Sequence, residues 1–281
     1  MATHPFRIVN VFTQNQGALT GNPLCVFESA ETFGTETMQG LARQFNLSET
    51  TFILPSTRGA ARVRIFTPSY EMPFAGHPTL GSAHVCRALK LGGDCLELEM
   101  QAGMIPVRAA GDRWTLTAPS PGWREFDTPS STLAAALGLE ARDIGERPLW
   151  VKAGKEQLVV PLTSTDAVRR AAPDSQLLNG IPGEDGQSMA YVFAFDGPGR
   201  VLARFFFAQG TAILEDPATG SATANFGGWC LSLQRRLPVE LQISQGEQAG
   251  RPSHLFLQVN EQRQIFVGGD VLEIGRGTVS L

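Results

Sequence analysis

The sequence predicts an α+β fold made of two related halves, in which strands dominate and helices are few. Two observations support this prediction: strand-like apolar runs recur along the 281 residues, and one short block is repeated about half a chain apart. With 42% hydrophobic and 18% charged residues, the composition is globular and suits one large domain or two of ordinary size.

The first half begins with a strand and contains two expected helices. A helix is expected over residues 35–46, because apolar residues recur there every three or four positions. Thr35 or Thr37 is its expected N-cap, and Asn46 tolerates the left-handed conformation that ends helices. A second helix, rich in small residues, is expected over 78–90, since proline suits the first helical position. Short strands are expected at 6–12, 50–54, 61–67, 97–99, 105–109 and 114–117.

The second half follows the best linker candidate, residues 118–122, where two prolines and a glycine resist both helix and sheet. Another proline-started helix of small residues is expected over 217–236, and its two final arginines complement the helix dipole. The remaining expected elements are helices near 131–137 and 165–172 and strands at 157–162, 189–195 and 201–207.

The repeated block aligns His-Pro-Thr-Leu-Gly-Ser-Ala at 77–83 with Asp-Pro-Ala-Thr-Gly-Ser-Ala at 216–222, at an offset of 139 residues. Upstream, Arg-Ile-Phe at 64–66 matches Arg-Phe-Phe at 204–206, at an offset of 140 residues. Two matches at nearly one offset indicate a duplication, with the residues before the two prolines in equivalent places.

Each half is therefore expected to bring a proline-started helix to one shared cleft. A helix start offers unpaired N–H groups and the positive end of the macrodipole. Two such starts would form an anion site suited to an amino-acid-like or aromatic acid. Alternatively, the small residues only allow each helix to sit inside a tightly wrapped sheet, and both interpretations can hold together.

Three side chains are candidates for acid/base chemistry. Glu49 has the apolar neighbours Leu47 and Phe52, and partial desolvation there would favour the protonated carboxyl used in general acid/base catalysis. It can equally be a solvated turn residue. His77 and Asp216 precede the two prolines, and an imidazole and a carboxylate on opposite sides of a cleft can move or stabilise a proton. Asp216 alone is more often a structural N-cap.

Composition and motifs argue against several other functions. The net charge is −4 without a basic run, so the cationic footprint of nucleic-acid binding is missing. No signal core and no run approaching the ~18 apolar residues of a membrane span occurs, so a cytoplasmic protein is expected. The four cysteines lack C-x-x-C spacing and are expected to be small buried residues. Walker, G-x-G-x-x-G, G-x-S-x-G and H-E-x-x-H motifs are all missing, so neither a nucleotide cofactor nor a metal is expected.

Several blocks together resemble the PhzF-like family, named for a phenazine-biosynthesis isomerase and sharing the diaminopimelate-epimerase-like fold. The blocks are Gly-Asn-Pro-Leu at 21–24, Asn-Leu-Ser-Glu-Thr at 46–50, Phe-Thr-Pro at 66–68, Glu-Met-Pro-Phe-Ala-Gly-His-Pro-Thr at 71–79, Glu-Asp-Pro-Ala-Thr-Gly-Ser-Ala at 215–222 and Gly-Arg-Pro-Ser at 250–253. The resemblance spans nearly the whole chain, and its two long blocks are highly specific.

The resemblance implies two pseudo-symmetric domains, each a curled, mainly antiparallel sheet around a central helix, with the active site between them. The first domain would comprise residues 1–118 and 266–281, and the second residues 119–265. The resemblance also implies a homodimer and no cofactor.

The resemblance further implies a role for each site residue. Glu49 would be the proton shuttle, taking a proton from an activated carbon and returning it elsewhere as double bonds move. His77 and Asp216 would complete the catalytic set by holding and polarising the substrate. The substrate-binding donors at the helix starts would be Gly76, Gly220 and Ser221.

The expected function is that of a cofactor-independent isomerase acting on a small aromatic or amino-acid-like carboxylate of the trans-2,3-dihydro-3-hydroxyanthranilate type. The alternatives are an epimerase or racemase acting on another small acid, a metal-dependent hydrolase or lyase with His77 and Asp216 as ligands, and a non-catalytic binding protein. Epimerases of the wider fold use two cysteines at the helix starts, which this chain lacks. Asn10 and Gln209 depart from the family pattern and could mark a different substrate, and Arg251 is expected to bind a substrate anion or form a surface salt bridge.

Overall fold

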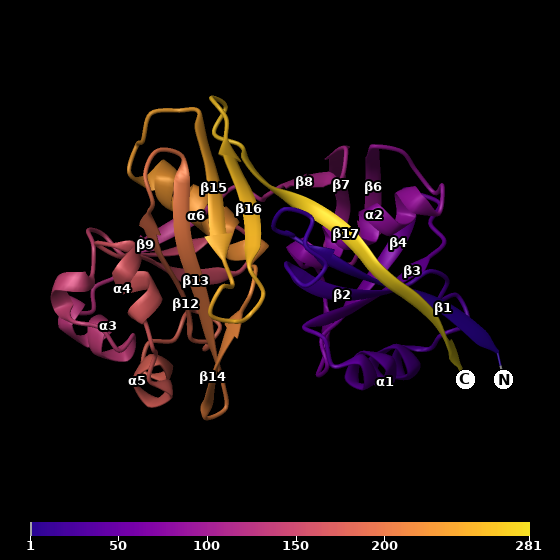
Figure 1. The fold of residues 1–281 in the computed structure, drawn as a ribbon, viewed down its shortest axis with the longest axis horizontal. Coiled ribbons are helices and arrows are strands. Elements are labelled where there is room, and N and C mark those ends of the chain that lie inside the picture. The colour runs from indigo at the N-terminus through magenta and orange to yellow at the C-terminus, as the bar shows by residue number, and fades with distance from the viewer. Residues whose placement is uncertain (1) are drawn as a thin grey trace. The chain divides into compact units, whose positions relative to one another are not determined.

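The structure, a computed structural model, describes residues 2–281 and divides into two compact units (Figure 1). The described part of unit 1 comprises residues 2–117 and Gly268–Leu281, and unit 2 comprises Ala118–Val267. None of the helices found in residues 2–281 has the length and apolar character needed to cross a membrane.

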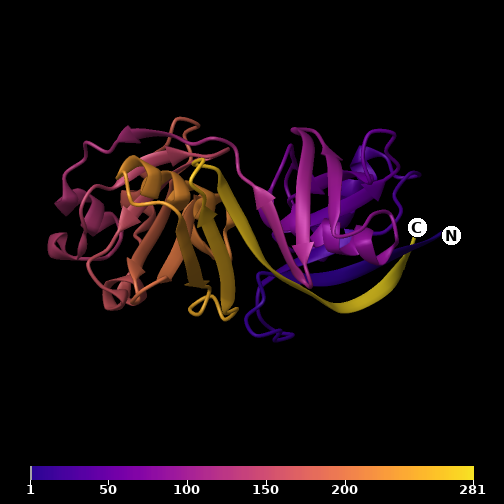
Figure 2. The ribbon, with the colours of Figure 1, turned by 90° about the horizontal axis from the view of Figure 1, so that it is seen from above.

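Unit 1 contains a sheet that closes on itself. Its strands are β1 (Thr3–Val11), β2 (Asn22–Phe27), β3 (Glu49–Leu54), β4 (Ala61–Phe66), β5 (Glu71–Met72), β6 (Cys95–Met100), β7 (Gly103–Ala110), β8 (Arg113–Thr117) and most of β17 (Ile265–Ser280). The pairs β2–β3 and β4–β6 are parallel, whereas β1–β2, β3–β4, β4–β5, β6–β7 and β7–β8 are antiparallel. Strand β17 pairs with both β1 and β8 and so completes the ring, whose curl is visible in Figure 2.

Two helices accompany this sheet. Helix α2 (Gly76–Ala88) contacts β1, β2, β3, β4, β6 and β8, so it is the helix enclosed by the ring. Helix α1 (Thr35–Phe45) packs on β3 and β4 and ends at Asn46, whose φ of 51° confirms the predicted left-handed end. Its N-cap is Gly34 rather than a threonine, because Thr35 is already the first residue of the helix, and the hydroxyl of Thr35 accepts a hydrogen bond from Arg64.

Unit 2 repeats the strand pairing of unit 1. Its strands are β9 (Gly122–Glu125), β10 (Leu149–Lys152), β11 (Glu156–Pro161), β12 (Met189–Phe195), β13 (Arg200–Gln209), β14 (Ala212–Asp216), β15 (Val239–Gln245) and β16 (Ser253–Val259). The pairs β11–β12 and β13–β15 are parallel, whereas β9–β10, β10–β11, β12–β13, β13–β14 and β15–β16 are antiparallel. The order of parallel and antiparallel pairs from β10 to β16 matches the order from β1 to β7, so the two units share one topology.

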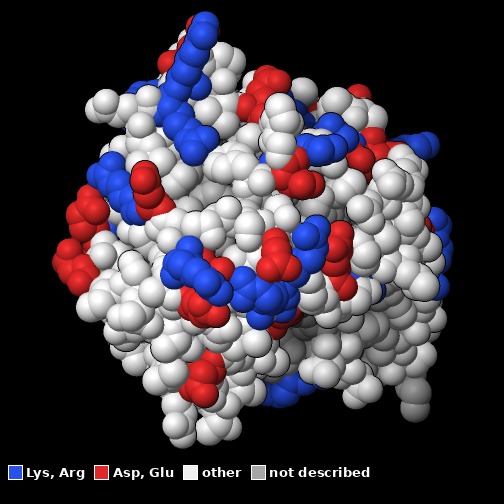
Figure 3. Space-filling view, turned by 60° about the vertical axis from the view of Figure 1, so that its left-hand side comes forward, with Lys and Arg blue, Asp and Glu red and all other residues white. Residues whose placement is uncertain are grey.

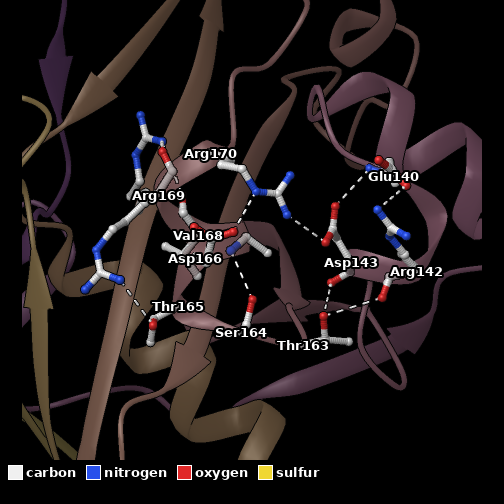
Figure 4. A network of polar contacts seen from close by, with 12 residues as sticks. Glu140, Arg142, Asp143, Thr163, Ser164, Thr165, Asp166, Val168, Arg169 and Arg170 are labelled. Carbon is white, nitrogen blue, oxygen red and sulfur yellow. Dashed lines mark hydrogen bonds and ion pairs between the residues drawn. The ribbon is translucent and has the colours of Figure 1, made fainter.

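The helix enclosed in unit 2 is α6 (Gly220–Ser232), which contacts β9, β10, β11 and β16. It is shorter at both ends than the predicted 217–236, so the two arginines predicted to end it lie beyond it. Around the sheet lie α3 (Ser130–Ala136), η1 (Ala141–Asp143), α4 (Thr165–Arg170) and α5 (Ser175–Asn179). Figure 4 shows how η1 is tied to α4: Arg170 donates to Asp143 at 2.9 Å, and the Glu140 backbone N–H donates to the same carboxylate at 3.0 Å.

The Arg-x-Phe sequence that recurs in the two halves makes the same contacts in both units. Arg64 binds Glu71 through two N–H groups at 2.6 and 2.7 Å. Arg204 binds Glu215 in the same way at 2.7 and 3.0 Å. Each guanidinium also lies over the phenylalanine ring two residues later, at 5.0 and 4.6 Å from the ring centroids. Each arginine thus ties its own strand to the short strand that leads to the enclosed helix.

The predicted alignment of the two helix starts is wrong by five residues. Helix α2 starts at Gly76 and α6 at Gly220, an offset of 144 residues, and the two arginine-bound glutamates have the same offset. Pro78 is therefore the third residue of α2, whereas Pro217 lies three residues before α6. The reason is that β14 stays paired with β13 as far as Asp216, so the chain must turn before a helix can begin.

Small residues let each enclosed helix approach the surrounding strands. A Cβ on Gly81 of α2 would lie 2.6 Å from a methyl of Leu24 and 3.0 and 3.1 Å from Val11 and Val9. These three side chains are fully buried and have no free volume to move into. A Cβ on Gly228 of α6 would likewise lie 2.7 Å from a valine of β10. The interpretation that small residues fit each helix inside a wrapped sheet is confirmed by these contacts.

Gly81→Ala is expected to lower the free energy of unfolding. Overpacking lowers the free energy of unfolding by about 1–3 kcal/mol. The better helix propensity of alanine raises it by at most about 1 kcal/mol. Gly40→Ala on α1 is the matched control, because nothing lies within 4 Å of the added Cβ, and it should leave stability unchanged or raised. Urea unfolding measures both variants, and equal stability of the two would contradict the enclosure of α2.

Candidate functional site

Two of the predicted residues meet in unit 1, beside the start of α2. Glu49 is the first residue of β3, and His77 is the second residue of α2. Oε2 of Glu49 lies 3.4 Å from Nε2 of His77, and the two side chains are only 15% and 7% exposed. They are neighbours because α2 packs against β3 inside the ring.

The hydrogen bond from His77 to the carbonyl of Pro23 decides which imidazole nitrogen carries the proton. Nε2 makes no hydrogen bond, so the donor to Pro23 is Nδ1–H. Burial lowers the pKa of His77 from 6.5 to about 3, although the bond to Pro23 acts in the opposite direction. The imidazole is therefore neutral at pH 7, and its short distance to Glu49 is not an ion pair.

Strand pairing explains why Pro23 is available to His77. Pro23 belongs to β2, which runs parallel to β3 with Leu24 opposite Glu49. The Gly-Asn-Pro-Leu and Ser-Glu-Thr blocks thus lie side by side. With its proton on Nδ1, the imidazole offers only a lone pair at Nε2, which stabilises the carboxyl of Glu49 when that group is protonated. The Glu49–His77 pair is suited to take up, hold and return one proton.

In unit 2, Asp216 is held at the turn before α6. Thr219 Oγ1 donates to Oδ2 of Asp216 at 2.6 Å, and Gln245 Nε2 donates to the Asp216 carbonyl at 2.9 Å. Gln245 also binds Thr219, donating to Oγ1 at 3.0 Å and accepting from the backbone N–H at 3.4 Å. We call these three residues the Asp216 cluster. The N-cap of α6 is Thr219, so Asp216 is not the structural N-cap that its sequence position allowed.

A second buried chain of hydrogen bonds reaches Ser221, the second residue of α6. Asn225 donates to Oε1 of Gln157 at 2.8 Å, and Gln157 Nε2 donates to Ser221 Oγ at 3.0 Å. The Asn225 carbonyl oxygen is itself occupied by the backbone N–H of Ala153. Because Ser221 accepts from Gln157, its own hydroxyl proton can be donated to another acceptor.

The six predicted site residues form two groups. Unit 1 holds Glu49, Gly76 and His77, and unit 2 holds Asp216, Gly220 and Ser221. The predicted equivalence of His77 and Asp216 is wrong: His77 and Ser221 are both second residues of their helices. The counterpart of Asp216 is Met72, because each is the last residue of its short strand and faces the residue after the paired arginine.

The starts of α2 and α6 share a property relevant to anions. Their N-caps are Ala75 and Thr219, and neither side chain caps its helix. The first backbone N–H groups of each helix, including those of Gly76 and Gly220, therefore donate no hydrogen bond to the N-cap side chain. Such groups at a helix start favour carboxylate binding.

Sequence reasoning missed four residues of the unit 2 site, namely Thr219, Gln245, Gln157 and Asn225. One signal was available in β15, where residues 241, 243 and 245 point to the same face by strand alternation. Gln245 on that face is fully buried next to the buried Ile243. A glutamine at an inward strand position requires buried hydrogen-bond partners.

Among the other candidate groups, one cysteine is placed differently from expectation, and Arg251 is half-buried. Cys25, Cys86 and Cys230 are buried as predicted, whereas Cys95 is exposed at the start of β6, which corrects that prediction. Burial raises the pKa of Cys86 and Cys230 to about 12. Burial also lowers the pKa of Arg251.

Neither the metal-binding side chains of residues 2–281 nor the charged side chains of the face in Figure 3 form a further site of the kinds considered from the sequence. Within that range no group of three or more His, Cys, Asp or Glu side chains is arranged to hold a metal ion. On the face seen in Figure 3, basic and acidic residues lie beside one another among uncharged ones. That face carries no basic stripe of the kind that nucleic-acid binding uses.

The chain is similar to phenazine biosynthesis-like proteins over most of its length. A family model described as "Phenazine biosynthesis-like protein" (PhzC-PhzF) matches residues 9–272. An isomerase of Pasteurella multocida, named as uncharacterized, is 36% identical over 280 residues, which are 99% of this chain and 94% of that protein. The trans-2,3-dihydro-3-hydroxyanthranilate isomerase of Pseudomonas aeruginosa is 35% identical over 262 residues, which are 90% of this chain and 89% of that protein.

Solved structures resemble the chain over its whole length. A PhzF-family phenazine biosynthesis protein of Bacillus anthracis superposes with a TM-score of 0.89 at 23% identity, covering 100% of both chains. A hydroxyproline epimerase from Agrobacterium vitis gives a TM-score of 0.68 at 12% identity, covering 99% of this chain and 93% of that one. These likenesses confirm the predicted epimerase-like α+β fold class.

The neutral, buried His77 predicts a specific acid sensitivity. Its pKa is about 3 in the folded protein and ordinarily 6.5, so between these values the unfolded chain binds a proton that the folded protein does not. The free energy of unfolding should therefore fall as pH falls, by about 1.4 kcal/mol per pH unit from this group. Urea unfolding between pH 4 and 6 should show a correspondingly shallower slope for His77→Gln. An unchanged slope would contradict the assignment of His77 as neutral and buried.

Proposed function

Because the chain belongs to the phenazine biosynthesis-like (PhzC-PhzF) family, we propose that it is a cofactor-independent isomerase of a small aromatic or amino-acid-like carboxylate. The substrate we propose is of the trans-2,3-dihydro-3-hydroxyanthranilate type, in line with the name of the Pseudomonas aeruginosa relative. The reaction moves one proton between two carbons of the substrate while its double bonds shift, so no oxidant or reductant is consumed.

The observation that carries this proposal is the Glu49–His77 pair. Glu49 takes the proton from an activated carbon, and the lone pair of His77 Nε2, at 3.4 Å, accepts a hydrogen bond from the protonated carboxyl. Because His77 stays neutral, it does not hold Glu49 in its charged form as a cationic partner would. The same carboxyl can then return the proton to a second carbon, which is the work of a general acid/base group.

Substrate binding is assigned to the two helix starts. The N–H groups at Gly76 and Gly220 and the hydroxyl of Ser221 are donors suited to a carboxylate. Asp216 completes the proposed catalytic set by binding a polar group of the substrate. Variants at the residues of either helix start should therefore lower turnover.

The positions of the cysteines do not support an epimerase that exchanges protons through two thiols. Neither enclosed helix starts with a cysteine, and burial raises the pKa of the Cys86 and Cys230 thiols to about 12, so they stay protonated at neutral pH.

The expected homodimer rests on the family resemblance, and sedimentation equilibrium of the full chain tests it.

Turnover in deuterated water tests the role of Glu49. The wild-type chain with trans-2,3-dihydro-3-hydroxyanthranilate should give an isomerised product that carries solvent deuterium, detected by mass spectrometry. Glu49→Gln should reduce both turnover and incorporation by about 10²-fold or more, because general acid/base groups contribute on that scale.

The matched control is Glu36→Gln, which makes the same change at an exposed position on α1 and should turn over like the wild type. Circular dichroism and urea unfolding check that both variants are folded. Equal deuterium incorporation by Glu49→Gln and the wild type would remove Glu49 from the proton transfer. If the wild-type chain does not turn over trans-2,3-dihydro-3-hydroxyanthranilate, the proposed substrate is wrong.

A further inference from the structure

The hydrogen bonds of the Asp216 cluster have one consistent direction. Oε1 of Gln245 accepts from the backbone N–H of Thr219, which identifies Nε2 as the end that donates. The two protons on Nε2 go to the carbonyl of Asp216 and to Oγ1 of Thr219, at 2.9 and 3.0 Å. Since the Thr219 hydroxyl accepts from Gln245, its own proton goes to Oδ2 of Asp216 at 2.6 Å.

Burial makes this direction obligatory. Gln245 is fully buried and Thr219 is 7% exposed, so water does not replace the bonds between them. Turning the amide of Gln245 around would set two N–H groups against each other and leave buried donors unsatisfied. The Asp216 carboxylate thus accepts a short, charge-assisted bond from a hydroxyl whose orientation is dictated by Gln245.

Unit 1 shows that this architecture forms without such a cluster. Met72 is the counterpart of Asp216, because each is the last residue of its short strand. Ala75 is the counterpart of Thr219, because each is the N-cap of its enclosed helix. Met100 is the counterpart of Gln245, because β6 pairs with β4 in the same register as β15 pairs with β13. All three positions that are polar in unit 2 are apolar in unit 1, although the strands and the enclosed helix are arranged alike. Packing of the fold therefore does not explain why Gln245 is a glutamine.

We infer that Gln245 is a positioning residue which, acting through the hydroxyl of Thr219, holds the Asp216 carboxylate in one orientation as a hydrogen-bond acceptor for the substrate. This inference rests on the proposed function, in which Asp216 binds the substrate. The backbone bond from Gln245 to the Asp216 carbonyl fixes the main chain, and the bond through Thr219 fixes the side chain. Gln245 itself does not touch the reacting atoms.

A pair of variants at Thr219 isolates the hydroxyl. Thr219→Val keeps the shape of the side chain and removes the donor to Asp216, so kcat/KM should fall about tenfold or more, the scale of one lost hydrogen bond. Thr219→Ser keeps the hydroxyl and should restore most of that loss. Gln245→Met copies the residue found in unit 1 and should lower kcat/KM in the same way as Thr219→Val. Equal activity of Thr219→Val and Thr219→Ser would overturn the inference.

A double-mutant cycle separates positioning from a general effect on folding. If Gln245 acts only through Asp216, then Gln245→Met should lower kcat/KM in the wild-type background and have little further effect in Asp216→Asn. Equal losses in both backgrounds would show a structural role and overturn the inference. If Gln245→Met does not fold, Thr219→Val in the same two backgrounds provides the cycle.

One measurement is independent of turnover. The side-chain amide protons of Gln245, followed by ¹H–¹⁵N NMR, should shift in Thr219→Val and Asp216→Asn but not in Asp196→Asn, an exposed aspartate of the same unit. Absent shifts would overturn the inference even if the substrate is correct. If the shifts occur but the chain does not turn over trans-2,3-dihydro-3-hydroxyanthranilate, the proposed substrate is wrong and the inference about Gln245 stands.

Discussion

The enclosure of a helix by a curled sheet is the constraint on which the rest of the structure depends. In unit 1 the ring closes through β17, and α2 contacts six of the strands, so a small residue is needed where the helix approaches them most closely, as at Gly81. Such a helix cannot shift along its axis without clashes, because protein interiors are close-packed. Its first residues are therefore fixed relative to the strands, and His77 is held against Glu49. The same enclosure removes water from the site and keeps the imidazole neutral.

The duplicated scaffold carries chemistry that has diverged between its halves. Structural parts are kept in both units: the arginine bound to a glutamate, the phenylalanine under it, and the glycine that starts the enclosed helix. Polar parts of the site are not kept. The strand registers match Glu49 with Met189 and Asp216 with Met72, so each proposed catalytic carboxylate has a methionine as its counterpart. The shared contacts therefore maintain the fold, and the proposed function rests on the positions that differ.

Burial acts on the Glu49–His77 pair and on the Asp216 cluster in different ways. In unit 1 it suppresses the charge of His77, which leaves a lone pair facing Glu49. In unit 2 it fixes a set of neutral hydrogen-bonding groups around Asp216, where Gln245 and Thr219 have a single satisfied arrangement. Both outcomes follow from the same principle, since a buried polar group keeps only the protonation state and direction that its neighbours can satisfy.

The sequence by itself determined the fold class, the existence of the repeat and the residues of the Glu49–His77 pair. Helix α1 and the recurrence of Arg-x-Phe were readable because amphipathic spacing and short local motifs act over a few residues. The starts of the two enclosed helices were misplaced, because strand pairing rather than proline decides where β14 ends. The equivalence of His77 with Ser221, the tautomer set by Pro23 and the support of Asp216 by Gln245 depend on contacts between residues far apart in the chain. Only the tertiary structure decided them, because registers and burial arise when the strands wrap the helix.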